Sequence, residues 1–249
     1  MSGGGLRLAV TLLTAVPVRD EPGEVPARRA GAAMSWAPVI GLLLGAAAAA
    51  VLWILGHYAH AGPLLAAVIS VAVLALLTRG LHLDGLADLA DGLGSRQPPG
   101  PALAIMKRSD IGPFGVVALV LTLLVQVAAL ARAEEIGRGV PAVITAVVAG
   151  RLALTWACRR GVPAAPGSTL GALVAGTVPP AVPVTLSVAA VAAGVAYRPI
   201  LGVGIVAGLA IAAGLTWHAV RRLSGITGDV LGALVEVTTA VCLLVTALS

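Results

Sequence analysis

The chain has 249 residues, of which 59% are hydrophobic and 11% are charged, and its formal net charge is +5. Soluble domains carry about 25% charged residues, so this composition excludes an ordinary soluble protein. It predicts an all-α, polytopic integral membrane helix bundle that forms one domain over residues 1–249. The positive charge is spread over short segments without interleaved aromatic residues. This disfavours a nucleic-acid partner and favours contact with the lipid bilayer.

A helix needs about 20 mostly apolar residues to cross a bilayer. We therefore expect about seven transmembrane helices, taken in chain order as Ser35–Gly56, Pro63–Thr78, Pro113–Ala131, Val140–Ala157, Ala181–Tyr197, Pro199–His218 and Asp229–Leu248. The run Leu6–Val18 is too short to span, so we expect it to lie at the interface or to re-enter the membrane. Pro63–Thr78 is also short unless it continues into the next stretch.

Small residues inside two of these spans predict close helix packing. Gly41 and Gly45 lie four residues apart, as do Gly204 and Gly208, and this spacing is typical of small-xxx-small helix contacts. The two cysteines have no metal-ligand spacing. We expect both to be small buried residues.

The basic residues are distributed unevenly between the two sides of the predicted bundle. With a cytoplasmic N-terminus, twelve of the 16 Lys and Arg residues fall in inside segments, while Arg132, Arg138 and Arg198 fall outside and Arg151 lies within a span. The positive-inside rule therefore predicts this orientation in the plasma (inner) membrane. It places the stretches "GLHLDGLADLADGLG" and "IMKRSDIGPFG" in one cytoplasmic loop and "RRLSGITGD" in another.

Three carboxylates stand close together in "GLHLDGLADLADGLG", residues 80–94. On a helix, Asp88 lies about +40° and Asp91 about −20° from Asp84, so all three share one stripe. Like charges at these spacings repel each other, and a divalent cation would remove the repulsion. Mg²⁺ prefers carboxylate oxygens and completes its shell with substrate phosphates. The stretch predicts a Mg²⁺ site, with a solvated acidic helix end as the alternative.

A second acidic pair opens the last predicted span. Asp229 and Glu236 are seven residues apart and share one helical face, and Glu236 lies about 10 Å into the span. An ionisable residue inside the membrane indicates a functional site, although Asp229 alone could be a favourable helix N-terminal acid. The candidate catalytic and metal-binding residues are Asp84, Asp88, Asp91, Asp229 and Glu236.

Basic residues suited to phosphate stand near these acids. Arg151 interrupts a span and needs a partner, for which the acidic cluster is the natural choice. Ser109 or Asp110 could cap the helix that begins at Pro113, and its N-terminal N–H groups would favour an anion. The candidate phosphate-binding residues are Lys107, Arg108, Ser109 and Arg151, with a positive-inside signal as the alternative for the first two. Together these residues predict a catalytic domain for phosphoryl or nucleotidyl chemistry on an amphiphilic substrate.

Three stretches resemble the signature sequences of the adenosylcobinamide-GDP ribazoletransferase (cobalamin synthase) family: "GLHLDGLADLADGLG", "IMKRSDIGPFG" and "GITGDVLGALVE". "LLTAVPV" and "WAPVIGLLLG" fit its N-terminal pattern. The resemblance implies a Mg²⁺-dependent membrane enzyme that joins adenosylcobinamide-GDP to α-ribazole, or to its 5′-phosphate, and releases GMP. We infer attack of the ribose 3′-hydroxyl on the cobinamide-linked phosphorus, with metal ions bound by the Asp stripe at the pyrophosphate.

The sequence departs from that family's pattern at two places. Arg108 and Asp110 look exchanged relative to the second signature, which leaves their individual roles open. Thr239 stands where the family often has a further acid, which weakens a metal-pair role for the last helix. The sequence leaves homo-oligomer formation open.

Other functions predict different patterns. A CDP-alcohol phosphotransferase would have two acids two residues apart and an Ala-Arg pair, an arrangement that "DGLADLADGLGSR" lacks. A membrane prenyltransferase would have two Asp-rich loops, and "GDVLGALVE" is a poor second copy of such a loop. A divalent-cation transporter, the alternative from another class, expects acids near the bilayer midplane and inverted repeats, which this sequence does not display.

Overall fold

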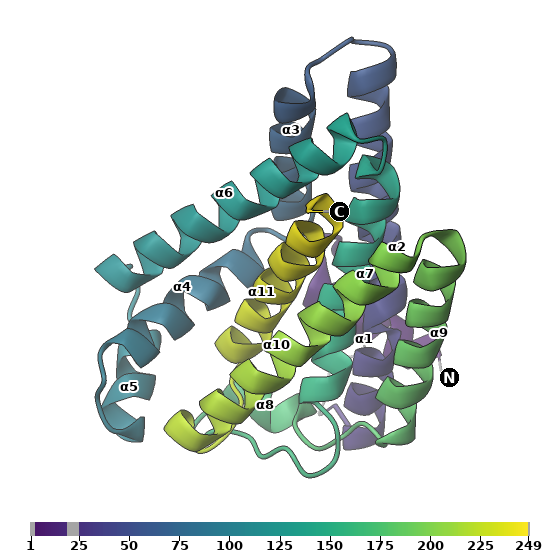
Figure 1. The fold of residues 1–249 in the computed structure, drawn as a ribbon. Coiled ribbons are helices and arrows are strands. Elements are labelled where there is room, and N and C mark those ends of the chain that lie inside the picture. Colours follow the sequence, from purple (N-terminus) through teal and green to yellow (C-terminus); the bar gives the residue numbers. More distant parts are fainter. Residues whose placement is uncertain (1–2, 19–24, 249) are drawn as a thin grey trace.

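The structure, a computed structural model, describes residues 3–18 and 25–248 and contains helices with no strand in these ranges (Figure 1). This confirms the all-α prediction. The helices are α1 (Gly3–Leu13), α2 (Ala27–His57), α3 (Pro63–Leu77), α4 (Leu81–Gly94), α5 (Pro99–Met106), α6 (Pro113–Glu135), α7 (Gly139–Ala157), α8 (Thr169–Val174), α9 (Ala181–Tyr197), α10 (Pro199–Leu223) and α11 (Gly228–Ala247).

Among the described residues, five helices are long and apolar enough to cross a membrane: α2, α6, α7, α10 and α11. The count rises to six if α3 and α4 are taken as one broken span, so the expected count of about seven is not confirmed. The seventh expected span is α9, which is absent from this count because its 17 residues extend only about 25 Å. It ends at Arg198, which is extended, and α10 restarts at Pro199.

The chain turns sharply between α3 and α4, whose axes differ by 89°. Arg79 and Gly80 both adopt left-handed backbone conformations, with φ of 55° and 67°, and glycine takes up this region without steric cost. The acidic helix α4 is therefore no straight continuation of α3. It lies alongside α6 and packs against α11 (Figure 1).

The interior is built on α7 and α11, most of whose residues are buried. Glycines bring neighbouring helices close to them. A Cβ added to Gly41 of α2 would lie 2.9 Å from the carbonyl oxygen of Val147, and one added to Gly45 would lie 3.0 Å from an α7 Cα atom. Gly204 and Gly208 of α10 approach α11 in the same way. The predicted small-residue packing is confirmed, and both cysteines are free and buried.

The run Leu6–Val18 forms the short helix α1 as far as Leu13 and then continues without regular structure. Its 11 residues cannot span a bilayer. Leu8 and Leu13 are buried, and a Cβ on Gly5 would meet Ala32, so α1 packs on the first half of α2. Whether this segment lies at the interface or re-enters stays a prediction.

Loops that the sequence assigns to one side of the membrane meet at one end of the bundle. Lys107 Nζ donates a hydrogen bond to the Gly167 carbonyl (3.1 Å), and Arg222 Nη2 donates one to the backbone of the α4–α5 loop (3.3 Å). Arg28 and Arg160 line one common cavity. We call this end, marked by Arg28, Lys107, Arg160 and Arg222, the basic end. That it faces the cytoplasm stays a prediction.

Candidate active site

The acidic stretch of α4 lies directly against the first turn of α11. A Cβ added to Gly85 would lie 2.9 Å from both the Cα and the carbonyl oxygen of Asp229, and one added to Gly232 would lie 3.0 Å from the carbonyl oxygen of His82. Since no side chain separates the two helices here, Asp84 and Asp88 stand beside Asp229. Asp88 interacts electrostatically with both of the other carboxylates.

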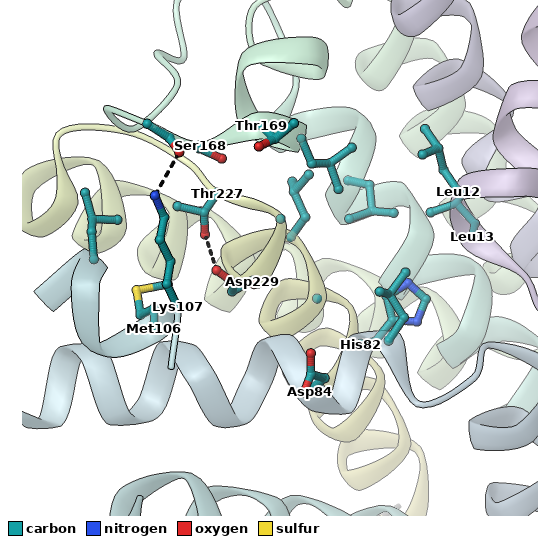
Figure 2. A pocket seen from close by; sticks show the side chains of 18 of the residues that line it. Leu12, Leu13, His82, Asp84, Met106, Lys107, Ser168, Thr169, Thr227 and Asp229 are labelled. Carbon is teal, nitrogen blue, oxygen red and sulfur yellow. Dashed lines mark hydrogen bonds between the residues drawn. The ribbon is translucent and has the colours of Figure 1, made fainter. Parts of the chain in front are cut away.

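A cavity of about 330 Å³ opens beside this crossing, at the basic end (Figure 2). One part of its wall is polar and the other is apolar. The polar part consists of Asp84, Lys107, Ser168, Thr169, Thr227 and Asp229. The apolar part includes Leu12, Leu13, Met34, Leu81 and Leu154. The predicted residues Asp84, Asp229 and Lys107 are therefore brought to a single cavity from three separate segments.

Asp229 is held in place by the N-cap of α11. The Thr227 hydroxyl accepts a hydrogen bond from the Val230 N–H (3.1 Å) and donates one to Asp229 Oδ2 (3.2 Å). The preceding Ile226 is fixed in turn, because its N–H donates to Pro163 and its carbonyl accepts from Ala165. The loop before α11 is thus pinned to the segment before α8, and the carboxylate of Asp229 is positioned at the cavity wall.

Lys107 reaches the cavity from the end of α5. Its ammonium donates to the carbonyl of Gly167 and interacts electrostatically with Asp229. The hydroxyl groups of Ser168 and Thr169 line the same part of the wall. An ammonium beside hydroxyl groups is suited to hold phosphate oxygens, so the structure brings the predicted phosphate ligand Lys107 to the cavity.

Asp91, the third carboxylate of the stripe, has a different environment. Its oxygens accept hydrogen bonds from the N–H groups of Gly112 (2.7 Å) and Gly115 (2.9 Å) at the start of α6. A Cβ on Gly115 would lie 2.5 Å from this carboxylate, so the glycines of "IGPFG" make the approach possible. Asp91 caps α6 and holds it against α4, and its predicted role as a metal ligand stays a prediction.

The same contact corrects the expectation that Ser109 or Asp110 caps α6. The N-cap residue is Gly112 and no side chain of its own segment caps the helix, because Asp91 supplies the anion. Arg108 and Ser109 are exposed and do not line the cavity. Arg108 instead makes a bidentate pair with Asp110 (3.0 and 2.8 Å), and this hydrogen bonding lowers the pKa of the Asp110 carboxyl.

Glu236 and Arg151 meet in a separate chamber of about 20 Å³ inside the bundle. Gln126 Nε2 donates to Glu236 Oε2 (2.8 Å), and Arg151 attracts Glu236 electrostatically. The carboxylate whose charge acts on Arg151 is thus Glu236 rather than a carboxylate of the Asp stripe. Asp229 and Glu236 share α11 but line different spaces, since two helical turns separate them.

Across residues 3–18 and 25–248, no group of three or more His, Cys, Asp or Glu side chains is spaced to hold a metal ion by itself. The carboxylates of Asp84, Asp88 and Asp229 nevertheless provide the hard oxygen ligands that Mg²⁺ prefers.

Known proteins resemble this chain over almost its whole length. A family profile described as cobalamin-5-phosphate synthase matches residues 5–247. A relative from Frankia casuarinae is 43% identical, over 98% of this chain and 94% of its own, and one from a Nocardioides species is 41% identical over 96% of each. One from Ectopseudomonas mendocina is 36% identical over 98% of each. All three are named adenosylcobinamide-GDP ribazoletransferase. The chain belongs to the cobalamin-5-phosphate synthase family.

Membership of the cobalamin-5-phosphate synthase family confirms the resemblance found in the sequence. No solved structure matches the chain. In this fold the first and third signature stretches of the cobalamin-5-phosphate synthase family are α4 and α11, which cross at Gly85. The second stretch supplies Lys107 and the start of α6. The three motifs therefore meet at one place.

Sequence reasoning missed Ser168 and Thr169, the two polar residues that the start of α8 contributes. Ser168 is the N-cap of α8 and accepts a hydrogen bond from the Gly171 N–H (3.0 Å). A serine before a short apolar turn is an N-cap signal, so "PGSTLG" predicts a helix start. It does not predict that Ser168 and Thr169 face Asp229 across a cavity.

Proposed function

We propose that this chain joins adenosylcobinamide-GDP to α-ribazole, or to α-ribazole 5′-phosphate. The products are adenosylcobalamin, or its 5′-phosphate, and GMP. The observation that supports this most is the meeting of Asp84, Asp229 and Lys107 at one cavity. Phosphoryl chemistry needs carboxylates to hold a metal ion and a positive charge to hold phosphate. These three side chains supply both, and they come from the three signature stretches of the family.

In the proposed reaction, the ribose 3′-hydroxyl oxygen of the acceptor attacks the cobinamide-linked phosphorus of the donor. A phosphorus–oxygen bond forms there, and the bond from that phosphorus to the bridging oxygen of the pyrophosphate breaks. GMP leaves with the electron pair. One carboxylate among Asp84, Asp88 and Asp229 takes the hydroxyl proton, as a general base within reach of the attacking oxygen.

These same three carboxylates would hold Mg²⁺, which neutralises charge on the pyrophosphate when bound. Mg²⁺ commonly uses one or two carboxylates and completes its shell with water and substrate phosphates. A Mg²⁺ ion that takes part of its shell from substrate phosphates would arrive with the donor. Mg²⁺ should therefore bind weakly until the donor is present.

Lys107 would hold a phosphate oxygen as a point charge. To do so it exchanges its hydrogen bond to the Gly167 carbonyl for one to the substrate, and the hydroxyls of Ser168 and Thr169 lie beside it. The basic end would face the cytoplasm of a plasma-membrane protein, and both substrates would reach the cavity from that side.

The direct test is GMP release by the purified protein in detergent with both substrates and Mg²⁺. We expect GMP only when adenosylcobinamide-GDP and α-ribazole are both present, because the acceptor is the nucleophile. Omission of α-ribazole is the matched control, since simple hydrolysis of the donor would release GMP without it. GMP formation that does not depend on α-ribazole, or no GMP at all, would contradict the proposed transfer.

A further inference from the structure

His82 contributes a buried polar group to the apolar part of the cavity. It precedes Asp84 by two residues on α4, and its ring lines the cavity on the side of Leu12 and Leu13, away from Lys107 (Figure 2). Only 3% of the residue is exposed. Its Nδ1 atom has no hydrogen-bond partner in the part of the chain that the structure describes.

A buried imidazole nitrogen without a partner is unusual, because buried polar atoms in proteins are almost always hydrogen-bonded. The charged group that acts on His82 is Arg151. A guanidinium can donate but never accept a hydrogen bond, and it makes none to His82. The imidazole ring is part of the cavity wall and has no competing hydrogen-bond partner among the described residues. Because Nδ1 itself has almost no accessible surface, a group in the cavity reaches this atom when the ring rotates.

The dimensions of the cavity limit what can enter it. About 330 Å³ is at the lower end of the range for small-molecule sites. This volume suits a molecule the size of a nucleoside, and a whole corrinoid donor is much larger. Aliphatic walls around Leu12, Leu13 and Leu154 favour an apolar group, and the imidazole offers that group a hydrogen bond.

We propose that the apolar part of the cavity binds the heterocyclic base of the acceptor, with His82 hydrogen-bonded to a ring nitrogen of that base. This inference rests on the proposed function and identifies which of the two substrates occupies the cavity. The base lies among Leu12, Leu13 and Met34, and the ribose extends toward Asp84 and Asp229. The corrinoid ring system of the donor stays outside, and only the pyrophosphate reaches the polar part.

The test separates the two substrates kinetically. In His82→Ala, we expect the KM for α-ribazole to rise by about tenfold, the value of a lost buried hydrogen bond. The KM for adenosylcobinamide-GDP and the kcat should stay close to wild type, and His82→Gln should recover part of the loss. Ser70→Ala is the matched control, because Ser70 is also buried without a hydrogen-bond partner but lies on α3 outside the cavity. Equal changes in both KM values, or none, would overturn the proposal.

A second measurement uses the wild-type protein and needs no variant to fold. Benzimidazole, a flat heterocycle with one donor and one acceptor nitrogen, should compete with α-ribazole in GMP release, whereas ribose should not. Competition by ribose alone would overturn the proposal. If wild-type protein releases no GMP with any acceptor, the proposed transfer itself has failed, which is distinguishable from failure of the base site.

Discussion

Gly85 sets the distance between the carboxylates of α4 and the first turn of α11. In Gly85→Ala the new Cβ would begin 2.9 Å from the Cα and the carbonyl oxygen of Asp229. An ordinary contact of this kind is about 3.5 Å, so the helices must separate by roughly 0.6 Å. Overpacking costs about 1–3 kcal/mol, which a bundle of this size can tolerate.

The effect of Gly85→Ala on activity should be larger than its effect on stability. A misplacement of about 1 Å can cost about 100-fold in rate, so a shift of about half that size predicts roughly a tenfold lower kcat. The assay is GMP release per mole of folded protein, with the melting temperature measured in the same detergent. Gly214→Ala is the matched control, because a Cβ there meets no atom within 4 Å and should leave both values unchanged. Wild-type turnover in Gly85→Ala would refute the role assigned to this crossing.

Three further predictions concern the cap, the metal and the orientation. Asp91→Asn should lower the free energy of unfolding by about 2 kcal/mol, since hydrogen bonds to a charged group are worth about 1.5–3 kcal/mol; a melting curve unchanged from wild type would contradict the capping role. EDTA should abolish GMP release, and added Mg²⁺ should restore it. Equilibrium dialysis should detect Mg²⁺ on the protein mainly when the donor is present. Full activity in EDTA would exclude a role for the metal ion in the reaction. In sealed inside-out vesicles, an impermeant maleimide should label Gln97→Cys but not Ala59→Cys. Background labelling should be low because Cys158 and Cys242 are buried. The reverse labelling pattern would contradict the predicted orientation.

Helical periodicity predicted which residues share a face but could not predict what lies opposite that face. The stretch over residues 81–94 is a helix. Asp84 lies near Asp229, which agrees with the prediction that both acidic stretches face the same side of the membrane. Asp91 belongs to the same stripe by angle. It caps α6 because Gly112 and Gly115 of a distant segment leave room for its carboxylate.

Long-range contacts explain the remaining differences. Arg151 and Glu236 both interrupt apolar spans, and a charge in a span needs a partner, but the sequence did not show that they line one chamber and attract each other. The expected number of spans is not confirmed, because α9 resembles a membrane helix in composition but has only 17 residues. Hydropathy gives the length of an apolar run, whereas the left-handed turn at Gly80 and the extended Arg198 decide where helices end.

The central claim is that the carboxylates at the α4–α11 crossing perform the chemistry, and Asp84→Asn tests it most directly. Asparagine keeps the size of the side chain and removes the charge and the basic oxygen. We expect Asp84→Asn to express and melt like wild type but to release no GMP above background from adenosylcobinamide-GDP, α-ribazole and Mg²⁺. Asp110→Asn, which removes an exposed carboxylate outside the cavity, should keep wild-type turnover. Wild-type turnover in Asp84→Asn would show that the acidic helix is only a solvated face.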